Sequence, residues 1–477
     1  MPEERHWLWG HGLKLLREPQ GDPSKEWLTK VKHDGLVRYL TFFNRERLIV
    51  YSPRALSDIY VANCYAFHKP SFLTNPMRVI LGNGLLVSEG DDHKFQKKGL
   101  LSAFTRQRVD ALYPVFCQRA SETIQEMRMA MKQNEGVLDI ANWASRYALD
   151  VIGSAGLGKD FGAIKDENNS LVKVYKKVFK VSKQQRIIFL LNTFLPWWLL
   201  SNLPLSHNRE LSQASKAIRQ VCQDVIHQRR AQYAHEGVWG SDLLSTAIQS
   251  GRFSDDNLID QVMTFLAAGH ETTESSLVWA IYLLAKHPEL QQKLRAEIRE
   301  NIPAIDSGTE VTNADLKRIP LLHAVCNETL RIFSPVRLTM REAACDTYLQ
   351  DTAVPCGTKV MISSCATNID ETLWGPDASE FNPYRWLRKN EEGNWEFLHE
   401  GGAMSKYAML TFSQGHRSCI GQRFARAEFA CLIAGWIGRF SFQLEDEALM
   451  DVSKLKIGNG ITAKPANGMR MRVGIVL

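Results

Sequence analysis

The chain of 477 residues is 44% hydrophobic and 23% charged, a globular balance that excludes a disordered or collagen-like protein. Its net charge of +6 is modest and dispersed, so we expect no nucleic-acid partner, but it suits an acidic protein partner or an anionic membrane surface. The nine cysteines are odd in number, scattered and never form CxxC. That pattern favours reduced thiols over a disulfide framework.

The first predicted elements are short strands in residues 36–51, where β-branched and aromatic residues surround a polar turn at Asn44 and Arg45. Residues 93–330 have a mainly helical pattern, and short strands return in residues 336–364. A last helix is predicted over residues 421–440. The fold class is therefore mainly α with a minor β portion.

The most apolar stretch, Ile187 to Leu205, approaches the length of a membrane span but contains two prolines and several polar residues. A surface rich in Trp and Leu that dips into a bilayer suits this composition better than a spanning helix. A buried core helix kinked at a proline is the alternative.

A long apolar helix is predicted between Ser254, a good N-cap, and the pair His287-Pro288. Its centre, from Gly269 to Ser276, is polar, and polar groups in a buried helix are costly unless they are hydrogen-bonded or functional. Gly269 also lets another group approach the backbone closely. The alternative is an exposed patch in the middle of the helix.

The stretch "FSQGHRSCIG" places a lone cysteine, Cys419, among glycines and an arginine. A thiolate serves as a nucleophile, a zinc ligand or an axial haem ligand. Zinc sites take three or four ligands, usually in close-spaced pairs, and the stretch has none. A nucleophilic thiol stays open as an alternative because His416 is near.

A haem iron needs only one protein ligand on this side, so a solitary cysteine is sufficient. Gly421 lets the backbone pack against a flat macrocycle, Arg417 can meet an anionic propionate, and Phe412 can shield the sulfur from water. The stretch matches Phe-x-x-Gly-x-Arg-x-Cys-x-Gly at all five fixed positions. It therefore resembles the haem-ligand signature of the cytochrome P-450 monooxygenases.

Two further sets of residues resemble marks of this family. "ETLR" gives Glu328 and Arg331, which lie three apart on a helix and can pair, and "FNPYRW" gives Arg385 as the third member of their network. "AGHETT" resembles the oxygen-activating turn of the central helix, with Glu271 and Thr272 as its acid–alcohol pair. The resemblance implies the cytochrome P-450 fold, with haem between a long central helix and a Cys-containing loop.

One stretch departs from the family pattern. The family often binds the haem propionates with a Trp and, four residues on, an Arg, where this chain has His93 and Lys97. Both side chains can still donate hydrogen bonds to carboxylates, as can Arg341 and Arg417. Lysine lacks the bidentate fork of arginine.

The chain looks most like the microsomal fungal-type branch of the family. This resemblance implies a haem-thiolate monooxygenase that inserts one oxygen atom from O2 into a lipophilic small molecule of secondary metabolism. Its cofactor would be haem b, with Cys419 as the axial iron ligand. Thr272 would hold the oxygen and Glu271 would feed protons. Relatives of this kind also catalyse oxidative coupling, ring formation or reductase-independent isomerase and peroxygenase reactions. A haem-binding sensor and a non-haem thiol enzyme are rival readings from other classes.

Electrons must come from outside the chain, because it has no Gly-rich dinucleotide or flavin fingerprint. Similarity to the microsomal branch implies an NADPH–cytochrome P-450 reductase as their source. Basic side chains that could meet the acidic surface of the reductase are Lys94, Lys97, Lys98, Arg106 and Arg108.

Similarity to the microsomal branch implies the endoplasmic reticulum membrane, with the catalytic domain facing the cytosol. The N-terminus "MPEERHWLWGHGLKLL" is charged and has no long apolar run. We therefore expect residues 1–24 to follow a missing or trimmed membrane anchor, and residues 25–477 to form a single haem-thiolate domain.

By analogy with the family fold, a set of largely apolar side chains would face a lipophilic substrate such as a terpenoid, alkaloid or polyketide. The set is Phe72, Met77, Leu81, Phe265, Ala268, Val336, Leu338 and Ile461.

Overall fold

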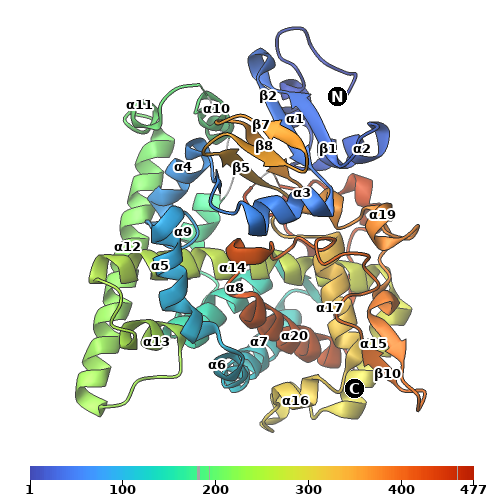
Figure 1. Ribbon diagram of the computed structural model, residues 1–477. Helices are drawn as coiled ribbons and strands as arrows, with labels where there is room; N and C mark the ends of the chain where they lie inside the picture. The colour runs from blue at the N-terminus through green and yellow to red at the C-terminus, as the bar shows by residue number, and fades with distance from the viewer. Residues whose placement is uncertain (180–182, 193, 459, 477) are drawn as a thin grey trace. The chain divides into compact units, whose positions relative to one another are not determined.

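The computed structural model describes residues 1–179, 183–192, 194–458 and 460–476 (Figure 1). Helices predominate along the chain, and the strands form small sheets. The predicted fold class, mainly α with a minor β portion, is confirmed.

The chain divides into two compact units, each assembled from separate segments. The first contains Met1–Pro70, Asn327–Cys419 and Ile457–Ala463, and the second contains Ser71–Cys326, Ile420–Lys456 and Lys464–Leu477. Residue 24, where the N-terminal segment was expected to end, lies inside helix α2 (Asp22–Lys30) of the first unit. The division into an N-terminal segment and one catalytic domain stays a prediction.

A five-stranded sheet organises the first unit, in the order β1-β2-β8-β5-β3. Strands β2 and β8 pair in parallel, and the other neighbours are antiparallel. The chain reverses between β1 and β2 at Phe43 and Asn44, which both have positive φ, so the predicted strand–turn–strand is present. The strands are β1 (Leu36–Leu40), β2 (Glu46–Val50), β3 (Phe67–His68), β5 (Thr339–Ala343) and β8 (Lys359–Ile362).

Shorter elements complete the first unit, and helix α17 (Pro320–Ile332) has residues in both units. Two hairpins pair β6 (Thr347–Leu349) with β7 (Thr352–Val354), and β9 (Leu387–Lys389) with β10 (Trp395–Phe397). The other helices are α1 (Gly12–Arg17), α3 (Pro53–Ser57), α18 (Ser364–Thr367) and α19 (Glu371–Trp374).

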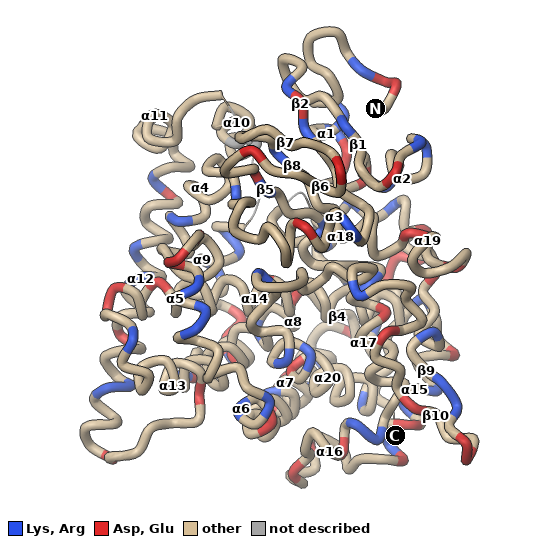
Figure 2. Tube along the Cα trace, in the orientation of Figure 1, with Lys and Arg blue, Asp and Glu red and all other residues tan. Residues whose placement is uncertain are grey.

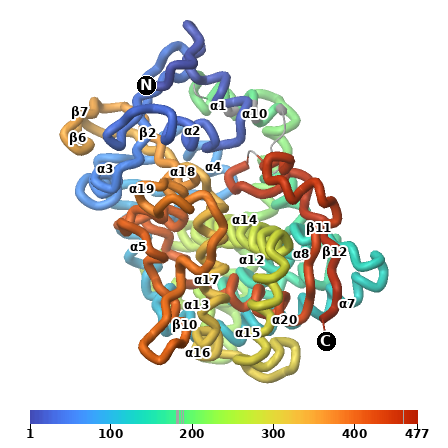
Figure 3. The backbone as a smooth tube through the Cα atoms, turned by 90° about the vertical axis from the view of Figure 1, so that its right-hand side faces the viewer, coloured from blue at the N-terminus to red at the C-terminus, as the bar shows by residue number. Residues whose placement is uncertain are grey.

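The second unit is mainly helical and is centred on α14 (Asp255–Lys286), which packs against α8, while α20 packs against α7. Figure 3 shows β11 (Phe440–Leu444) and β12 (Arg470–Ile475) side by side, and β4 (Val137–Asp139) pairs with the other edge of β12. The other helices are α4 (Ser71–Leu81), α5 (Gly90–Leu100), α6 (Arg106–Asp110), α7 (Tyr113–Gln133), α8 (Ile140–Val151), α9 (Ser170–Phe179), α10 (Lys183–Leu191), α11 (Trp197–Ser201), α12 (Ser206–Glu236), α13 (Leu243–Gln249), α15 (Pro288–Asn301), α16 (Asn313–Leu316) and α20 (Gln422–Arg439).

The long central helix α14 begins after Ser254 and ends before His287, as the sequence predicts. The hydroxyl of Ser254 accepts a hydrogen bond from the backbone N–H of Asn257, and His287 follows the last helical residue. Six polar residues at its centre, His270, Glu271, Thr273, Glu274, Ser275 and Ser276, are buried. The alternative of an exposed patch in mid-helix is therefore wrong, because most of the polar centre lies in the interior.

In the apolar stretch from Ile187 to Leu205, helix α10 ends at Leu191 and α11 begins directly after Pro196. Trp198 is 67% exposed, and Leu195, Leu199 and Leu203 are also exposed, so the buried core helix is the wrong alternative. Within the described parts of the chain, no helix combines the length and the apolarity needed to cross a membrane. Contact of this surface with a bilayer stays a prediction, and Thr193 lies outside the described residues.

Candidate active site

The predicted site residues are divided between the two units, and each half has its own geometry. The first unit holds Cys419, the Glu328 network, Phe412, Arg417, Arg341, Val336, Leu338 and Ile461. The second holds Glu271, Thr272, His93, Lys97, Gly421, Phe72, Met77, Leu81, Phe265 and Ala268.

Backbone contacts fix the loop that carries Cys419. The N–H of Cys419 donates to the carbonyl of Phe412 at 2.8 Å, which closes the loop. Gly415 has φ +62°, and a Cβ built on it would lie 2.2 Å from the carbonyl oxygen of Tyr60. Only glycine suits this position, because any side chain would be both strained and in collision with backbone.

The thiol of Cys419 is exposed and stands just before a helix. Helix α20 begins three residues later, at Gln422, with Gly421 as its N-cap. The guanidinium of Arg417 lies over the ring of Tyr65, with Cζ 5.0 Å from the ring centroid. Cys419 is therefore accessible and lies in a loop that a backbone hydrogen bond closes.

Glu328 is the centre of a buried network in the first unit. One carboxylate oxygen accepts from Arg331 Nη2 at 2.7 Å, from the N–H of Asn382 at 2.9 Å and from Arg385 Nε at 3.0 Å. The other accepts from Arg331 Nε and from Trp386 Nε1, both at 2.8 Å. The three residues that sequence reasoning grouped are in direct contact, whereas Asn382 and Trp386 were missed.

The remaining candidates of the first unit differ in exposure. Arg341, on β5, is buried and donates from Nη1 to the carbonyl of Met340 at 2.8 Å. Val336 and Leu338 are partly buried. Ile461 is 51% exposed, so it differs from the other side chains proposed to line an apolar pocket.

In the second unit, one face of α14 is partly open. From Leu258 to Leu284 every described residue is buried except Ala268, Gly269 and Thr272. These three positions share a face because they are spaced i, i+1 and i+4. The hydroxyl of Thr272 donates to the carbonyl of Ala268 at 2.7 Å. Thr272, the residue predicted to hold the oxygen, is therefore partly accessible on a helix that is otherwise mostly buried.

At Gly269 of α14, packing within the second unit leaves little room for a side chain. A Cβ on Gly269 would lie 3.0 Å from Cδ1 of Ile152, in the π-helical turn η4 (Ile152–Leu157). The glycine predicts that another group approaches the helix backbone closely, and that group is the side chain of Ile152.

Glu271 is buried and ion-paired. Nζ of Lys464 lies 3.2 Å from its carboxylate and 2.8 Å from Oε1 of Glu274, one turn along the same helix. Burial lowers the pKa of Lys464, but the charges of Glu274 and Glu271 outweigh burial, and the net shift is upward. The spacing of Glu271 and Glu274 signals a shared face, but nothing in the sequence indicates that Lys464 joins them.

Two further polar contacts stabilise the centre of α14. His270 Nε2 lies 2.8 Å from the hydroxyl of Ser145, and burial lowers the pKa of His270 to about 3, so its ring is neutral. Thr273 donates to Glu428 of α20 at 2.5 Å. Burial raises the pKa of Glu428 to about 8, which keeps this carboxyl protonated at neutral pH.

Helix α5 places His93 and Lys97 on one face, four residues apart. His93 is buried and Lys97 partly buried, whereas their neighbours Lys94 and Lys98 are exposed. Figure 2 shows basic segments on α5 and α6. Some of this charge is balanced locally, because Lys94 pairs with Asp91 at 2.7 Å.

The substrate-facing candidates of the second unit lie on two packed helices. Phe72 and Leu81 on α4 and Phe265 on α14 are buried, and Met77 is partly buried. The two helices are also joined by Thr264, whose hydroxyl donates to the carbonyl of Leu81 at 3.0 Å.

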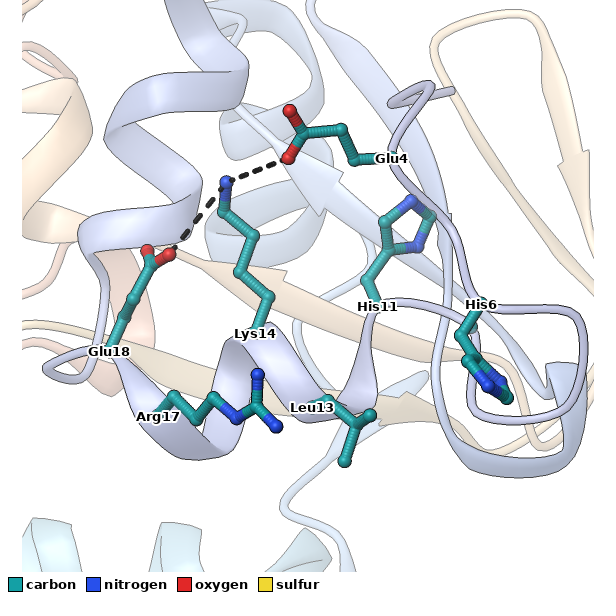
Figure 4. A pocket seen from close by; sticks show the side chains of 8 residues that line it. Glu4, His6, His11, Leu13, Lys14, Arg17 and Glu18 are labelled. Carbon is teal, nitrogen blue, oxygen red and sulfur yellow. Dashed lines mark ion pairs between the residues drawn. The ribbon is translucent and has the colours of Figure 1, made fainter.

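A separate pocket of about 280 Å³ lies in the N-terminal part of the first unit (Figure 4). Lys14 crosses it, with Nζ 3.6 Å from Glu4 and 3.7 Å from Glu18. It shares no residue with the predicted site.

The residues in each unit fit a haem. Cys419 offers an exposed thiol in a loop closed by backbone contacts. Gly421 has room for a side chain among the described residues, since its Cβ would meet only Cε1 of Phe104 at an ordinary 3.7 Å. In the second unit, Ala268 and Thr272 of α14 are partly exposed, and α5 offers His93 and Lys97 as hydrogen-bond donors. A thiolate, flat open backbone surfaces and cations for propionates are the parts that haem binding requires.

Comparison with known proteins gives one consistent family. Residues 1–469 match the family described as Cytochrome P450. The cytochrome P450 monooxygenase sphH of Aspergillus fumigatus is 40% identical, over 98% of this chain and 86% of that protein. FUM15 of Gibberella moniliformis is 39% identical over 98% and 86%, and ALT8 of Alternaria alternata 37% identical over 98% and 88%. Both are also named cytochrome P450 monooxygenases.

Proposed function

Because the chain belongs to the cytochrome P450 family, we propose that it is a haem-thiolate monooxygenase of secondary metabolism that oxidises a lipophilic small molecule. The observation that carries this proposal is the exposed Cys419, held in a closed loop directly before α20. Oxidative coupling and ring formation use the same residues and remain within the proposal.

Several residues would hold haem b. Cys419 would supply the thiolate ligand, with Phe412 and Gly421 of the same sequence stretch. Arg417, Arg341, His93 and Lys97 would donate hydrogen bonds to the propionates. When bound, a thiolate-ligated haem supplies O2 activation and the oxidation of unactivated C–H bonds.

The chain itself would handle protons and orient the substrate. Glu271 would pass protons, and Thr272, whose hydroxyl donates to Ala268 O, keeps its lone pairs available to accept a hydrogen bond. Buried apolar side chains such as Phe72, Leu81 and Phe265 would exclude water and favour a lipophilic substrate.

We further propose that electrons come from an NADPH-dependent reductase that meets the basic surface of α5 and α6. The exposed side chains around Trp198 support contact with a membrane surface, and we propose the endoplasmic reticulum membrane, facing the cytosol.

The decisive test is the absorption spectrum of purified protein, reduced with dithionite and exposed to carbon monoxide. We expect a strongly red-shifted Soret band that Cys419→Ala abolishes. Cys345→Ala, at another exposed cysteine of the first unit, is the matched control and should keep the band. No haem absorption in well-folded, haem-supplied protein would overturn the proposal. Reductase-dependent NADPH oxidation by the haem protein then separates an oxygenase from a sensor or an isomerase.

A further inference from the structure

Two exposed cysteines lie at the base of the β6–β7 hairpin of the first unit, and the proposed function uses neither of them. Of the nine cysteines, six are buried, and the exposed ones are Cys345, Cys356 and Cys419. Cys419 is the proposed haem ligand. Cys345 precedes β6 and Cys356 follows β7, and Figure 3 shows these two strands at the outer edge of the first unit. Exposed thiols are the ones that solutes can reach and oxidise.

The strand register places Cys345 opposite Cys356. β5 pairs with β8 and β6 pairs with β7 at the same offset, so the two paired stretches belong to one antiparallel ladder. Ala343 continues the pairing between them, since its N–H donates to the carbonyl of Thr358 at 3.0 Å and its carbonyl accepts from Gly357 at 2.8 Å. Counted from either stretch, the two cysteines occupy directly opposite positions. Opposite side chains of an antiparallel pair share a face of the sheet, with Cβ atoms about 4.5–5.5 Å apart.

Two contacts of Cys356 support this placement independently of the register. Its thiol donates to the carbonyl of Ala344 at 3.4 Å, and its N–H donates to Oδ1 of Asp346 at 2.8 Å. Ala344 and Asp346 are the residues directly before and after Cys345. The sulfur of Cys356 thus contacts the peptide group that leads into Cys345. A disulfide needs Cβ atoms about 3.5–4.5 Å apart, so a small shift at this exposed position is sufficient to form one.

A second pair of cysteines has close sulfurs but lacks access to solvent. The sulfurs of Cys117 on α7 and Cys431 on α20 lie 3.7 Å apart, and both side chains are buried. Burial raises the pKa of Cys431, whereas attack on a disulfide requires a thiolate. This pair therefore has proximity without exposure, and the hairpin pair combines the two.

We propose that Cys345 and Cys356 form a reversible dithiol–disulfide site that reacts with small soluble disulfides such as oxidised glutathione. The thiolate of one cysteine attacks a glutathione sulfur, which forms a mixed disulfide and releases one glutathione as its thiol. The thiolate of the other cysteine then attacks the mixed disulfide, forms the bond between Cys345 and Cys356 and releases the second glutathione. Two protein thiols are oxidised, and one oxidised glutathione is reduced to two thiols, which carry away the two protons. The bond closes a ring that contains all of β6 and β7, so the oxidised form fixes the base of this hairpin.

The test uses the whole chain as purified with its cofactor and exposes it to excess oxidised glutathione. Acid stops the exchange, and the thiols that remain are alkylated in denaturant. Trypsin releases both cysteines in one peptide, residues 342–359, because no lysine or arginine lies between Arg341 and Lys359. We expect mass spectrometry to show that this peptide has lost two hydrogen atoms and carries neither the alkylating reagent nor glutathione. The peptides that contain Cys117 and Cys431 should be alkylated.

Two single variants test whether the cysteines react with each other. Cys345→Ser and Cys356→Ser each leave one exposed thiol at the hairpin, with no partner thiol to displace a bound glutathione. We expect both variants to accumulate glutathione on the remaining cysteine, and the wild-type peptide to carry at least about tenfold less. Dithiothreitol should return the wild-type peptide to its fully alkylated form.

Three results would overturn the inference. Glutathione retained on the wild-type peptide as fully as on the single variants would show that the two sulfurs do not reach each other. The absence of any reaction in the wild type and in both variants would show that the thiols are not accessible. A bond between Cys117 and Cys431 that forms as fast as the hairpin bond would show that exposure does not select the site.

The inference and the proposed function fail separately. The thiol chemistry needs no haem, so a chain that binds none still forms or fails to form the hairpin bond. The carbon monoxide spectrum of the haem protein should be the same before and after the bond forms, because the reaction leaves Cys419 untouched. If a serine variant does not fold, the mass of the wild-type peptide decides alone, since only the bond removes two hydrogen atoms and blocks alkylation.

Discussion

Two clusters of charged side chains, one in each unit, differ in how far they are closed to solvent. Glu328 accepts five hydrogen bonds, and its partner Arg385 also pairs with Asp377 at 2.8 Å, so two acids face two guanidinium groups. In the other cluster the ammonium of Lys464 contacts two buried glutamates. The side chains of Glu328 and Arg331 are fully buried, whereas that of Lys464 is 25% exposed.

The difference teaches which cluster depends most on each of its contacts. A guanidinium group does not release its proton in a protein, so the loss of Glu328 would leave Arg331 buried without its carboxylate partner. The side chain of Lys464 is partly exposed, so water can solvate its ammonium group if a contact is lost. The Glu328 network is therefore a fixed framework, whereas the Lys464 cluster is open to solvent.

The largest expected effect breaks the fixed framework. Glu328→Gln should lower the free energy of unfolding by about 3–5 kcal/mol, because it leaves buried guanidinium groups without a countercharge. Denaturant unfolding measures the change. Glu396→Gln is the control, since its pair with Arg388 at 3.5 Å is exposed and should contribute less than about 1 kcal/mol. Equal unfolding midpoints for the two variants would contradict the contrast.

Glu428 sharpens the comparison, because this fully buried carboxyl has the hydroxyl of Thr273 as its partner in place of a cation. Burial raises its pKa to about 8, so the folded protein keeps a proton that the unfolded chain releases above about pH 4.5. The stability that Glu428 contributes is therefore full at low pH and is lost as the pH rises toward 8.

Relative to Glu428→Gln, which does not titrate, the free energy of unfolding of the wild type should fall by up to about 1.4 kcal/mol per pH unit between pH 5 and 8. Denaturant unfolding at several pH values measures this slope. Parallel stability curves for the two proteins would mean that Glu428 is already ionised in the folded state.

The smallest expected effect is on the stability of Lys464→Met. The side chain of Lys464 is 25% exposed, so water offsets part of its contacts with the glutamates, and the free energy of unfolding at pH 6 should fall by about 1 kcal/mol. Denaturant unfolding at pH 6 checks this. A loss at pH 6 as large as that of Glu328→Gln would show that Lys464 belongs to a fixed framework as well.

Local patterns were sufficient to predict the elements and part of the site. Ser254 and the pair His287-Pro288 mark the ends of α14, and the glycines around Cys419 mark its loop. Glu328 and Arg331 are neighbours on one helix, so their contact follows from spacing alone.

The contacts that the sequence did not reveal join residues far apart in the chain. Lys464 meets Glu274 across 190 residues, Thr273 meets Glu428 across 155, and Trp386 meets Glu328 across 58. Such pairs depend on how whole elements pack, and neither residue carries a periodic or terminal signal of its partner. The division into two units has the same origin, since each unit is assembled from distant segments.

The two glycines that flank Cys419 differ in what surrounds them. A side chain at Gly415 would collide with the carbonyl of Tyr60, whereas one at Gly421 would meet only the ring of Phe104 at an ordinary distance among the described residues. In a library of all single substitutions, selection for folded protein alone should deplete every replacement at Gly415 and retain alanine at Gly421. Selection for pigment binding should then remove larger side chains at Gly421 as well. Comparing the substitutions tolerated at the two positions thus separates what folding requires from what cofactor binding requires.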